Sequence, residues 1–298
     1  MSYEMTRVTL PSGIELDVRD KGPRNAETLI FLHGFPESHR TWRHQIAHFS
    51  DRYRCVAPDQ RGYRSSSKPQ DAAMYTPDKL IGDVFAMADA LEVENFTVVG
   101  HDWGGAIAWG TALRGQFEGR VKRAIIANAP HPLIFARLLF LHEGQRAASQ
   151  YIRSFRDPTS DAFVREHGLA ALLKRELKWD RAPDMGEHER ERQLEDWADP
   201  ETGIAMLNWY RSSPINVPPM DAPFELPTDY TPPALPNLTI PTLVIWAMND
   251  MALPPANLDG LDDLVDDLTI AKVTDCGHFV TWEKPDAVNG AMAEFLKR

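Results

Sequence analysis

The sequence predicts an α/β fold in which a mostly parallel central sheet is covered by helices on both faces and carries one helical insertion. Strand and helix patterns alternate through the first third of the 298 residues and resume in the last quarter. Short runs such as TLIFLHGF are largely apolar, which is typical of strands buried on both faces. Between these regions, residues 131–236 show helical periods without strand patterns. We therefore expect a core of residues 1–130 and 237–298, with residues 131–236 inserted as a helical block.

Each element of the first third follows from a local signal. RVTLPSGIELDVRD (residues 7–20) predicts two strands around a Pro-Ser-Gly turn. Residues 76–93 predict a helix, because Thr76 suits its cap and Pro77 suits its first position. A further helix is expected from Trp103 to about Arg114. The remaining strands are predicted at TLIFLHGF, RCVAPDQRG, NFTVVG and VKRAIIANAP.

The insertion and the last quarter are interpreted in the same way. Helical periods span DAFVREHGLAALLKRELKW (161–179) and ERERQLEDWADPETGIAMLNWYR (189–211). The mixed charges of EHERERQLED predict a solvated helix face. From residue 214 onward, frequent prolines predict an extended loop that is poor in hydrogen bonds. Strands are then expected at PTLVIWAMND and TIAKVTDCG, and helices around PANLDGLDDLV and over KPDAVNGAMAEFLKR.

Composition excludes several classes of partner. The formal net charge of -11 argues against a nucleic-acid partner and gives no support for binding to an anionic membrane. The two cysteines, Cys55 and Cys276, are too few for a disulfide framework and are expected to be buried thiols. No run approaches the roughly 20 apolar residues of a membrane span, and the N-terminus lacks a signal-peptide pattern. We therefore predict a cytoplasmic protein, either a monomer or a homodimer.

Polar residues that follow the predicted strands suggest a single site, because active groups of parallel sheets lie on loops at the carboxyl ends of strands. These residues are HGFP at 33–36, Asp102, Asp250 and His278. VVGHDWGGAIAW (98–109) has the outline of a nucleophile elbow, a sharp turn from strand to helix, with Asp102 in the raised position. A single Asp there could simply cap the helix. The order nucleophile, acid, base along the chain instead favours a catalytic triad of Asp102, Asp250 and His278.

Five motifs resemble the soluble epoxide hydrolases of the α/β-hydrolase superfamily: HGFPES (33–38), DQRGYRSS (59–66), GHDWGG (100–105), LNWYR (207–211) and DCGHF (275–279). The resemblance covers nearly the whole chain and implies an α/β-hydrolase fold whose insertion is a helical lid, or cap, over the site. GHDWGG is shared with haloalkane dehalogenases, whereas HGFPE together with a lid NWYR is more specific to epoxide hydrolases. Arg64 departs from the family pattern, in which small residues are common at its position.

The resemblance implies a reaction that converts a small apolar epoxide and water to a vicinal diol. Asp102 would attack an epoxide carbon and form a covalent ester, because a carboxylate needs no base to act as a nucleophile. Two lid tyrosines would donate to the leaving oxygen. Tyr210 in LNWYR matches one of them, and Tyr151 is the match for the other. His278, oriented by Asp250, would activate the water that hydrolyses the ester.

The resemblance also implies an oxyanion hole made by the backbone N–H groups of Phe35 and Trp103, whose side chains would line the pocket. His33 and His101 are expected to shape loops through hydrogen bonds rather than to act as bases or metal ligands. Neither a metal-ligand spacing nor a nucleotide-binding motif is found, so we expect no cofactor and no metal. Further pocket linings are expected among lid aromatics, namely Phe135, Phe155, Phe163, Trp179 and Trp209.

Two alternative functions remain open at this point. A haloalkane or haloacid dehalogenase would use the same Asp102 ester, and Trp103 could bind the departing halide. In dehalogenases, however, an Asn commonly stands where Phe35 is found, and the tyrosines favour an epoxide. A non-catalytic ligand-binding receptor on this scaffold would be expected to lack part of the triad or the tyrosine pair. A serine-type esterase is disfavoured because Asp102 occupies the nucleophile position.

Overall fold

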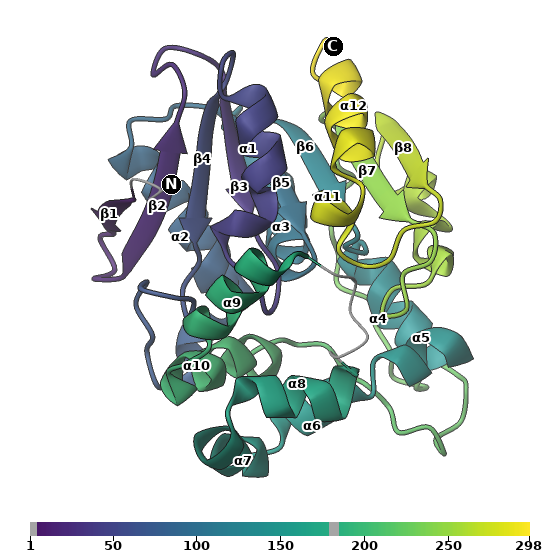
Figure 1. The fold of residues 1–298 in the computed structure, drawn as a ribbon. Helices are drawn as coiled ribbons and strands as arrows, with labels where there is room; N and C mark the ends of the chain where they lie inside the picture. The colour runs from purple at the N-terminus through teal and green to yellow at the C-terminus, as the bar shows by residue number, and fades with distance from the viewer. Residues whose placement is uncertain (1–4, 179–184) are drawn as a thin grey trace.

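The computed structural model describes residues 5–178 and 185–298, and the strands of these residues form one eight-stranded sheet (Figure 1). The strand order is β1-β2-β4-β3-β5-β6-β7-β8. Strand β2 pairs antiparallel with β1 and β4, and all later neighbours are parallel. The predicted α/β class and the mostly parallel sheet are therefore confirmed. The strands are β1 (Thr6–Thr9), β2 (Glu15–Lys21), β3 (Thr28–Leu32), β4 (Arg54–Asp59), β5 (Phe96–His101), β6 (Val121–Ala127), β7 (Thr242–Ala247) and β8 (Leu268–Val273).

Helices cover both faces of the sheet, because alternate side chains of its buried strands point to opposite sides. In β3, Leu29 and Phe31 join one core cluster, whereas Ile30 and Leu32 join the other. The first cluster packs against α1 (Arg43–Phe49), α11 (Val280–Glu283) and α12 (Pro285–Phe295), and the second packs against α2 (Pro77–Ala90) and α3 (Trp103–Gly115). Cys55 and Cys276 are free, buried thiols, as predicted.

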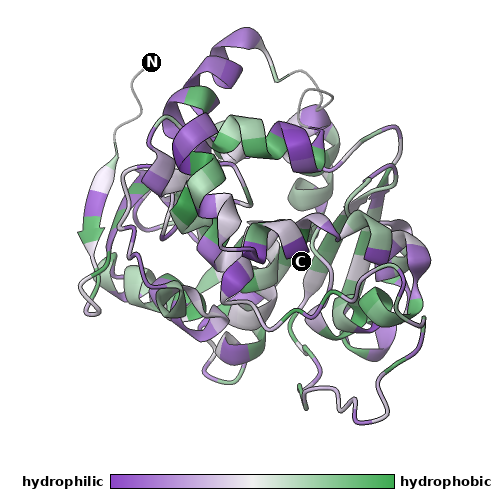
Figure 2. Ribbon diagram, turned by 90° about the horizontal axis from the view of Figure 1, so that it is seen from below, coloured by the Kyte–Doolittle hydropathy of each residue, from purple (hydrophilic) through white to green (hydrophobic). Residues whose placement is uncertain are grey.

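The described helices between β6 and β7 lie beyond the edge of the sheet at which the parallel strands end (Figure 1). Figure 1 shows α6 to α10 beyond the arrowheads of the parallel strands, where their carboxyl ends lie. In Figure 2, hydrophobic and hydrophilic stretches alternate along the helices of this side, which is typical of helices that bury one face. These helices are α4 (Pro132–Leu141), α5 (Glu143–Ala148), α6 (Tyr151–Arg156), α7 (Thr159–His167), α8 (Leu169–Leu177), α9 (Glu187–Asp196) and α10 (Pro200–Arg211).

Several local predictions need correction. The helix expected around PANLDGLDDLV is replaced by two 3₁₀ turns, η4 (Pro255–Leu258) and η5 (Leu261–Asp263), separated by Gly260 in a left-handed conformation. The helical period predicted over 161–179 is split between α7 and α8 at Gly168, whose φ of 83° ends the first helix, and the last residue of that period lies outside the described residues. Thr76 and Pro77 do occupy the predicted cap and first position of α2, although the Thr76 side chain makes no capping hydrogen bond. Two further 3₁₀ turns are η1 (His39–Trp42) and η2 (Ala72–Tyr75).

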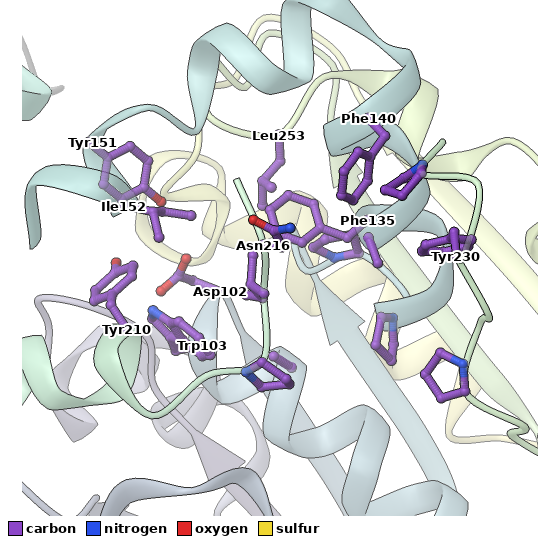
Figure 3. A pocket seen from close by; sticks show the side chains of 18 of the residues that line it. Asp102, Trp103, Phe135, Phe140, Tyr151, Ile152, Tyr210, Asn216, Tyr230 and Leu253 are labelled. Carbon is purple, nitrogen blue, oxygen red and sulfur yellow. The ribbon is translucent and has the colours of Figure 1, made fainter. Parts of the chain in front are cut away.

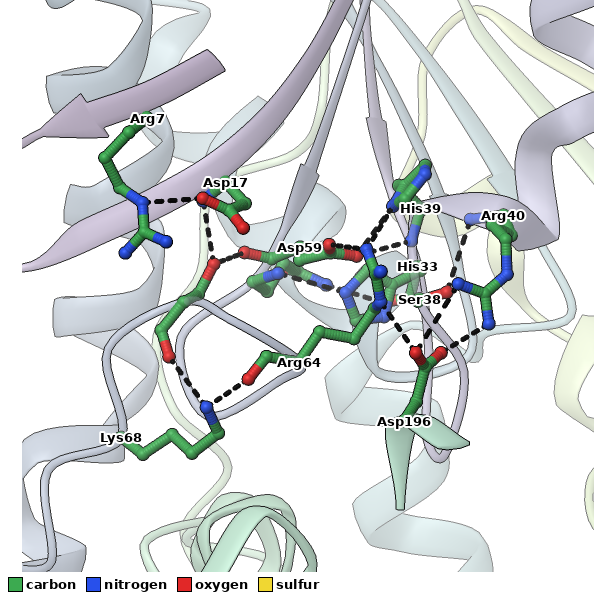
Figure 4. Close-up of polar contacts among 12 residues, drawn as sticks. Arg7, Asp17, His33, Ser38, His39, Arg40, Asp59, Arg64, Lys68 and Asp196 are labelled. Atoms are coloured by element: carbon green, nitrogen blue, oxygen red, sulfur yellow. Dashed lines mark hydrogen bonds and ion pairs between the residues drawn. The ribbon is translucent and has the colours of Figure 1, made fainter. Parts of the chain in front are cut away.

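Helix α9 is fastened to the core by charged groups, so its predicted solvated face is only part of its surface (Figure 4). Asp196 accepts from the guanidinium groups of Arg64 at 2.8 Å and Arg40 at 2.5 Å. Arg64 has a positive φ of 43° and also donates to Asp59 at 2.7 Å. Burial raises the pKa of Asp59, but the neighbouring His39 and Arg64 outweigh it and hold that pKa well below its usual value. Arg64, which departs from the family pattern, therefore joins the core to α9.

Candidate active site

The turn between β5 and α3 holds Asp102 in a sharply bent conformation, with φ 53° and ψ -123°. Glycines make this turn possible because other chain segments approach it closely. A Cβ on Gly104 would lie 2.2 Å from the carbonyl oxygen of Leu32, and a Cβ on Gly34 would lie 2.4 Å from the Cβ of Asp102. Gly104 of GHDWGG and Gly34 of HGFP thus allow the close packing of the elbow. The bend projects the Asp102 side chain beyond the carboxyl end of β5.

The Asp102 carboxylate is bound at both oxygens, and it does not cap α3. Its Oδ1 accepts from the backbone N–H of Phe35 at 2.7 Å, and its Oδ2 lies 3.4 Å from His278 Nε2. Burial raises the pKa of Asp102, but the hydrogen bond and charge of His278 outweigh it and lower that pKa below its ordinary value. The backbone N–H of Trp103 also lowers the pKa of Asp102, although the Asp102 side chain makes no capping hydrogen bond to α3. Asp102 is therefore an ionised carboxylate at neutral pH.

Asp250 and His278 lie together at the ends of β7 and β8. His278 Nδ1 is 2.7 Å from Asp250 Oδ2, and Asp250 Oδ1 accepts from the N–H groups of Ala252 and Leu253 at 2.8 and 3.0 Å. Burial lowers the pKa of His278, but the Asp250 charge and the bonds to both carboxylates outweigh it and raise that pKa well above its ordinary value. The structure thus brings all three predicted triad residues together, with the imidazole between two carboxylates.

Two supporting residues were not predicted from the sequence. Asn128 follows β6 with a positive φ of 40°, and its side chain donates to Asp250 Oδ2 at 2.7 Å. Asn128 stands at the carboxyl end of a strand, so the rule that located Asp102 and Asp250 could have found it. Glu283 accepts from the N–H groups of Gly277 and Phe279 at 2.8 and 2.9 Å, on either side of His278. No short motif marks that contact.

His33 and His101 shape loops, as expected. His33 Nδ1 lies 3.0 Å from the carbonyl oxygen of Gly34, and its Nε2 accepts from the N–H of Gln60 at 3.0 Å. His101 Nε2 lies 2.8 Å from the carbonyl oxygen of His278. Both rings are buried. They therefore hold the loops that carry Phe35 and His278.

Two tyrosines from different helices face Asp102 across a cavity (Figure 3). Tyr151 begins α6 and Tyr210 lies near the end of α10, and their ring centroids are 5.9 Å apart. Figure 3 shows both hydroxyls directed toward the Asp102 carboxylate. Burial, together with the charge of Asp102, raises the pKa of each tyrosine, so both stay protonated at neutral pH. The pair therefore presents two O–H donors above the carboxylate.

The cavity has a volume of about 420 Å³, and its lining differs in part from the prediction. Trp103 and Phe135 line it as expected. Phe35, Phe155 and Trp209 do not, because they pack behind the surface. Phe35 and Phe155 contact the Tyr210 ring at centroid distances of 5.1 Å each, and Trp209 donates its indole N–H to the carbonyl of Arg61. Phe163 packs against His167 and Arg175 instead, and Trp179 lies outside the described residues.

Comparison with known proteins shows the protein family to which the chain belongs. The family model described as "alpha/beta hydrolase fold" matches residues 27–285. The chain is also 32% identical over 289 residues to the AB hydrolase superfamily protein YfhM of Bacillus subtilis, covering 96% of each protein. The chain therefore belongs to the alpha/beta hydrolase fold family.

Within this family, the comparisons place the chain among the epoxide hydrolases. A solved structure from a study of novel epoxide hydrolases in metagenomes from hot environments is 66% identical, covers 99% of both chains and has a TM-score of 0.97. Epoxide hydrolase 1 of Caenorhabditis elegans is 30% identical over 295 residues, covering 96% of this chain and 68% of that protein. The predicted resemblance is confirmed.

Proposed function

We propose that the chain converts an epoxide to a vicinal diol through a covalent ester on Asp102. The observation that carries this proposal is the arrangement of Asp102 between two kinds of partner. Figure 3 shows the hydroxyls of Tyr151 and Tyr210 facing its carboxylate, and His278 Nε2 lies 3.4 Å from its Oδ2. A nucleophile, a pair of O–H donors and a general base are the groups that a two-step opening and hydrolysis needs.

In the first step, Asp102 Oδ2 attacks one carbon of the epoxide, and the ring C–O bond breaks. The electron pair of that bond passes to the ring oxygen, which would be a poor leaving group without hydrogen-bond donors. Tyr151 and Tyr210 supply these donors and a proton. Because Asp102 Oδ1 accepts from the Phe35 N–H and Oδ2 lies 3.4 Å from His278 Nε2, the carboxylate is held in one orientation, and Oδ2 is the proposed attacking oxygen.

In the second step, water attacks the carboxyl carbon of Asp102 while His278 Nε2 removes a proton from that water. Negative charge develops on Asp102 Oδ1, where the Phe35 N–H is already in place and the Trp103 N–H is the proposed second donor. The bond from the carbon to Oδ2 then breaks. The oxygen that was Oδ2 leaves with the diol, and His278 gives its proton to that oxygen. Asp102 then carries the second proton of the water, and this proton returns to the tyrosine that gave one up in the first step, so Asp102 and both tyrosines regain their starting states.

The charges around His278 support this order of events. In the free protein, the carboxylates of Asp250 and Asp102 both raise its pKa, so the imidazole is protonated. Ester formation neutralises Asp102, and it thereby removes one of the two charges that raise the pKa of His278. The pKa of His278 then falls, and the neutral imidazole can act as a base. Asp250 remains to orient the ring, with Asn128 as its further hydrogen-bond partner.

We also propose that residues 131–236 act as a lid over a core of residues 1–130 and 237–298. The cavity supports this division, because Phe135, Tyr151 and Tyr210 face Asp102 across it. Among the described residues, no helix is both long and apolar enough to cross a membrane. A cytoplasmic location remains a prediction from the sequence. The sequence also predicts either a monomer or a homodimer.

The proposed reaction is tested by assaying the purified protein on styrene oxide, an aliphatic epoxide, a haloalkane, fluoroacetate and a p-nitrophenyl ester. We expect diol from the epoxides. Release of halide without any diol would instead support the dehalogenase alternative, and binding of epoxides without turnover would support the receptor alternative.

Replacement of His278 tests the covalent step separately. In His278→Gln the ester should form but not hydrolyse, so intact-mass spectrometry should show protein plus one whole substrate molecule. The matched variant His278→Gln with Asp102→Ala should show unlabelled protein. Labelling that survives the loss of Asp102 would contradict its role as the nucleophile.

A further inference from the structure

The proline-rich segment of residues 212–236, here called the strap, forms one side of the substrate cavity. It connects α10 to the region before β7, and it contains no helix or strand. Residues from both ends of the strap line the cavity: Pro214, Ile215, Asn216, Pro227, Asp229, Tyr230 and Pro233. Prolines lack the N–H group that would pair such a segment with a neighbouring strand. Something else must therefore hold the strap in place.

Side chains of residues 146–156 supply the missing hydrogen bonds. Four of these side chains donate to carbonyls of the strap. The two segments run antiparallel, so donors later in the sequence contact strap residues that come earlier. The pairs are Arg146 to Ala222 at 2.7 Å and Pro223 at 2.9 Å, Gln150 to Pro218 at 3.0 Å, Arg153 to Val217 at 3.0 Å and Arg156 to Ser213 at 2.9 Å. The strap is thus bound along its first half by side-chain donors from α5, from α6 and from the short turn between them.

Arg146 makes the largest number of these contacts, and its side chain is fully buried. Besides the strap carbonyls, its guanidinium donates to the carbonyls of Leu139 at 2.9 Å and Phe140 at 2.6 Å. These two carbonyls belong to the last turn of α4, where a helix leaves its carbonyls without internal partners. The guanidinium also lies 3.7 Å from the ring centroid of Phe224 in the strap. Arg146 therefore joins the end of α4 to the strap.

The two segments that Arg146 joins form the end of the cavity farthest from Asp102. Figure 3 shows Asp102, Tyr151 and Tyr210 at one end and Phe140 and Tyr230 at the other. The rings of Phe140, from α4, and Tyr230, from the strap, have centroids 6.0 Å apart. A volume of about 420 Å³ falls in the range of pockets that enclose drug-sized ligands. It is larger than a bare epoxide requires.

We propose that Arg146 is a positioning residue that sets selectivity for epoxides carrying an extended apolar arm. The arm lies between α4 and the strap and reaches toward Phe140 and Tyr230, while the epoxide ring lies against Asp102. Arg146 touches neither the ring nor the arm, and it acts by fixing the two segments that enclose the arm. This inference rests on the proposed epoxide hydrolysis.

The test compares Arg146→Met with the wild type on two epoxides, butylene oxide with a short arm and benzyl glycidyl ether with a long one. We expect kcat/KM for the long substrate to fall at least about tenfold, mainly through KM, because the arm loses its enclosing walls. For the short substrate kcat/KM should stay within about twofold. The control is Arg137→Met, which removes an exposed arginine of α4 and should change neither value. The rate of hydrogen exchange of the strap amides should rise in Arg146→Met and stay at the wild-type value in Arg137→Met.

Equal losses on both epoxides, or no loss on either, would overturn the inference. If Arg146→Met does not fold, Arg153→Met and Gln150→Leu each remove a single strap contact, and each should lower the ratio of long to short kcat/KM. An unchanged ratio in both would also overturn it. A wild type that hydrolyses neither epoxide would refute the proposed function itself, which is a separate outcome.

Discussion

The two sides of the cavity are held in opposite ways. On the core side, carboxylate side chains accept from backbone N–H groups: Asp102 from Phe35, and Asp250 from Ala252 and Leu253. On the lid side, arginine side chains donate to backbone carbonyls, as Arg156 does to Tyr210 at 2.8 Å. The core side carries the proposed nucleophile and base, and the lid side carries the two proposed O–H donors. The comparison predicts that changes to His278 and Asp250 on the core side affect ester hydrolysis, whereas changes on the lid side affect ring opening and substrate fit.

The largest effect is expected from the lid tyrosines. Tyr151→Phe combined with Tyr210→Phe should lower the rate of ester formation at least about 10⁴-fold, because loss of one such donor typically costs about 10²- to 10³-fold. The measurement is the single-turnover rate of Asp102 labelling by rapid quench and mass spectrometry. Each single variant should show an intermediate loss. Near-normal labelling in the double variant would show that other groups protonate the leaving oxygen.

A change on the core side should block the other half-reaction. Asp250→Asn removes the charge that orients and supports His278, so ester hydrolysis should slow by about 10³-fold while ester formation changes little. The ester should therefore accumulate during turnover and appear in the intact mass of the protein. Slowed ester formation without accumulation would contradict the separation of roles between the two sides.

The two half-reactions should also differ in their response to pH. Ester formation needs ionised Asp102, lost as pH falls through its lowered pKa, and protonated tyrosines, lost as pH rises through their raised pKa values. Its rate should thus be flat from about pH 5 to pH 10. Ester hydrolysis needs neutral His278 and should rise with pH until that imidazole is deprotonated. If the rate of ester formation falls as pH rises, and this fall begins before about pH 8, the assignment of the tyrosines would be contradicted.

The smallest effect is expected where the lid and core meet through α9. Asp196→Asn removes the charge that Arg40 and Arg64 share, and the partly buried position suggests a loss of about 2 kcal/mol in the free energy of unfolding. Denaturant titration measures this loss. The control is Glu191→Gln, an exposed acid on the same helix. Equal stability of both variants would show that the contact to Asp196 contributes little.

The sequence predicted the core side of the site better than the lid side. GHDWGG, HGFP and DCGHF are short motifs because a strand end, a tight turn and a helix start lie within a few residues. Asp102, Asp250 and His278 were found from these strand ends, and the structure brings them together. The mostly parallel sheet was predicted from the alternation of strand and helix patterns along the chain. Asn128 could have been found in this way.

The lid side depends on contacts between residues far apart in the sequence. Arg146 meets strap carbonyls 76 and 77 positions later, and backbone carbonyls carry no residue-specific signal. The predicted linings Phe155 and Trp209 are large and apolar, but sequence alone does not distinguish a lining from the packing behind it. The 3₁₀ turns at 255–263 were expected as a helix, because Gly260 was not identified as a break.

The central claim, an ester on Asp102, is tested most directly by one turnover in water labelled with oxygen-18. Enzyme in excess over epoxide should leave the heavy oxygen in the Asp102 carboxylate, because water attacks the carboxyl carbon and the diol leaves with an oxygen of Asp102. Mass spectrometry of the peptide containing Asp102 should show one heavy oxygen, and the diol should show none. A labelled diol with an unlabelled Asp102 would mean that water attacks the epoxide directly, and the account would be wrong.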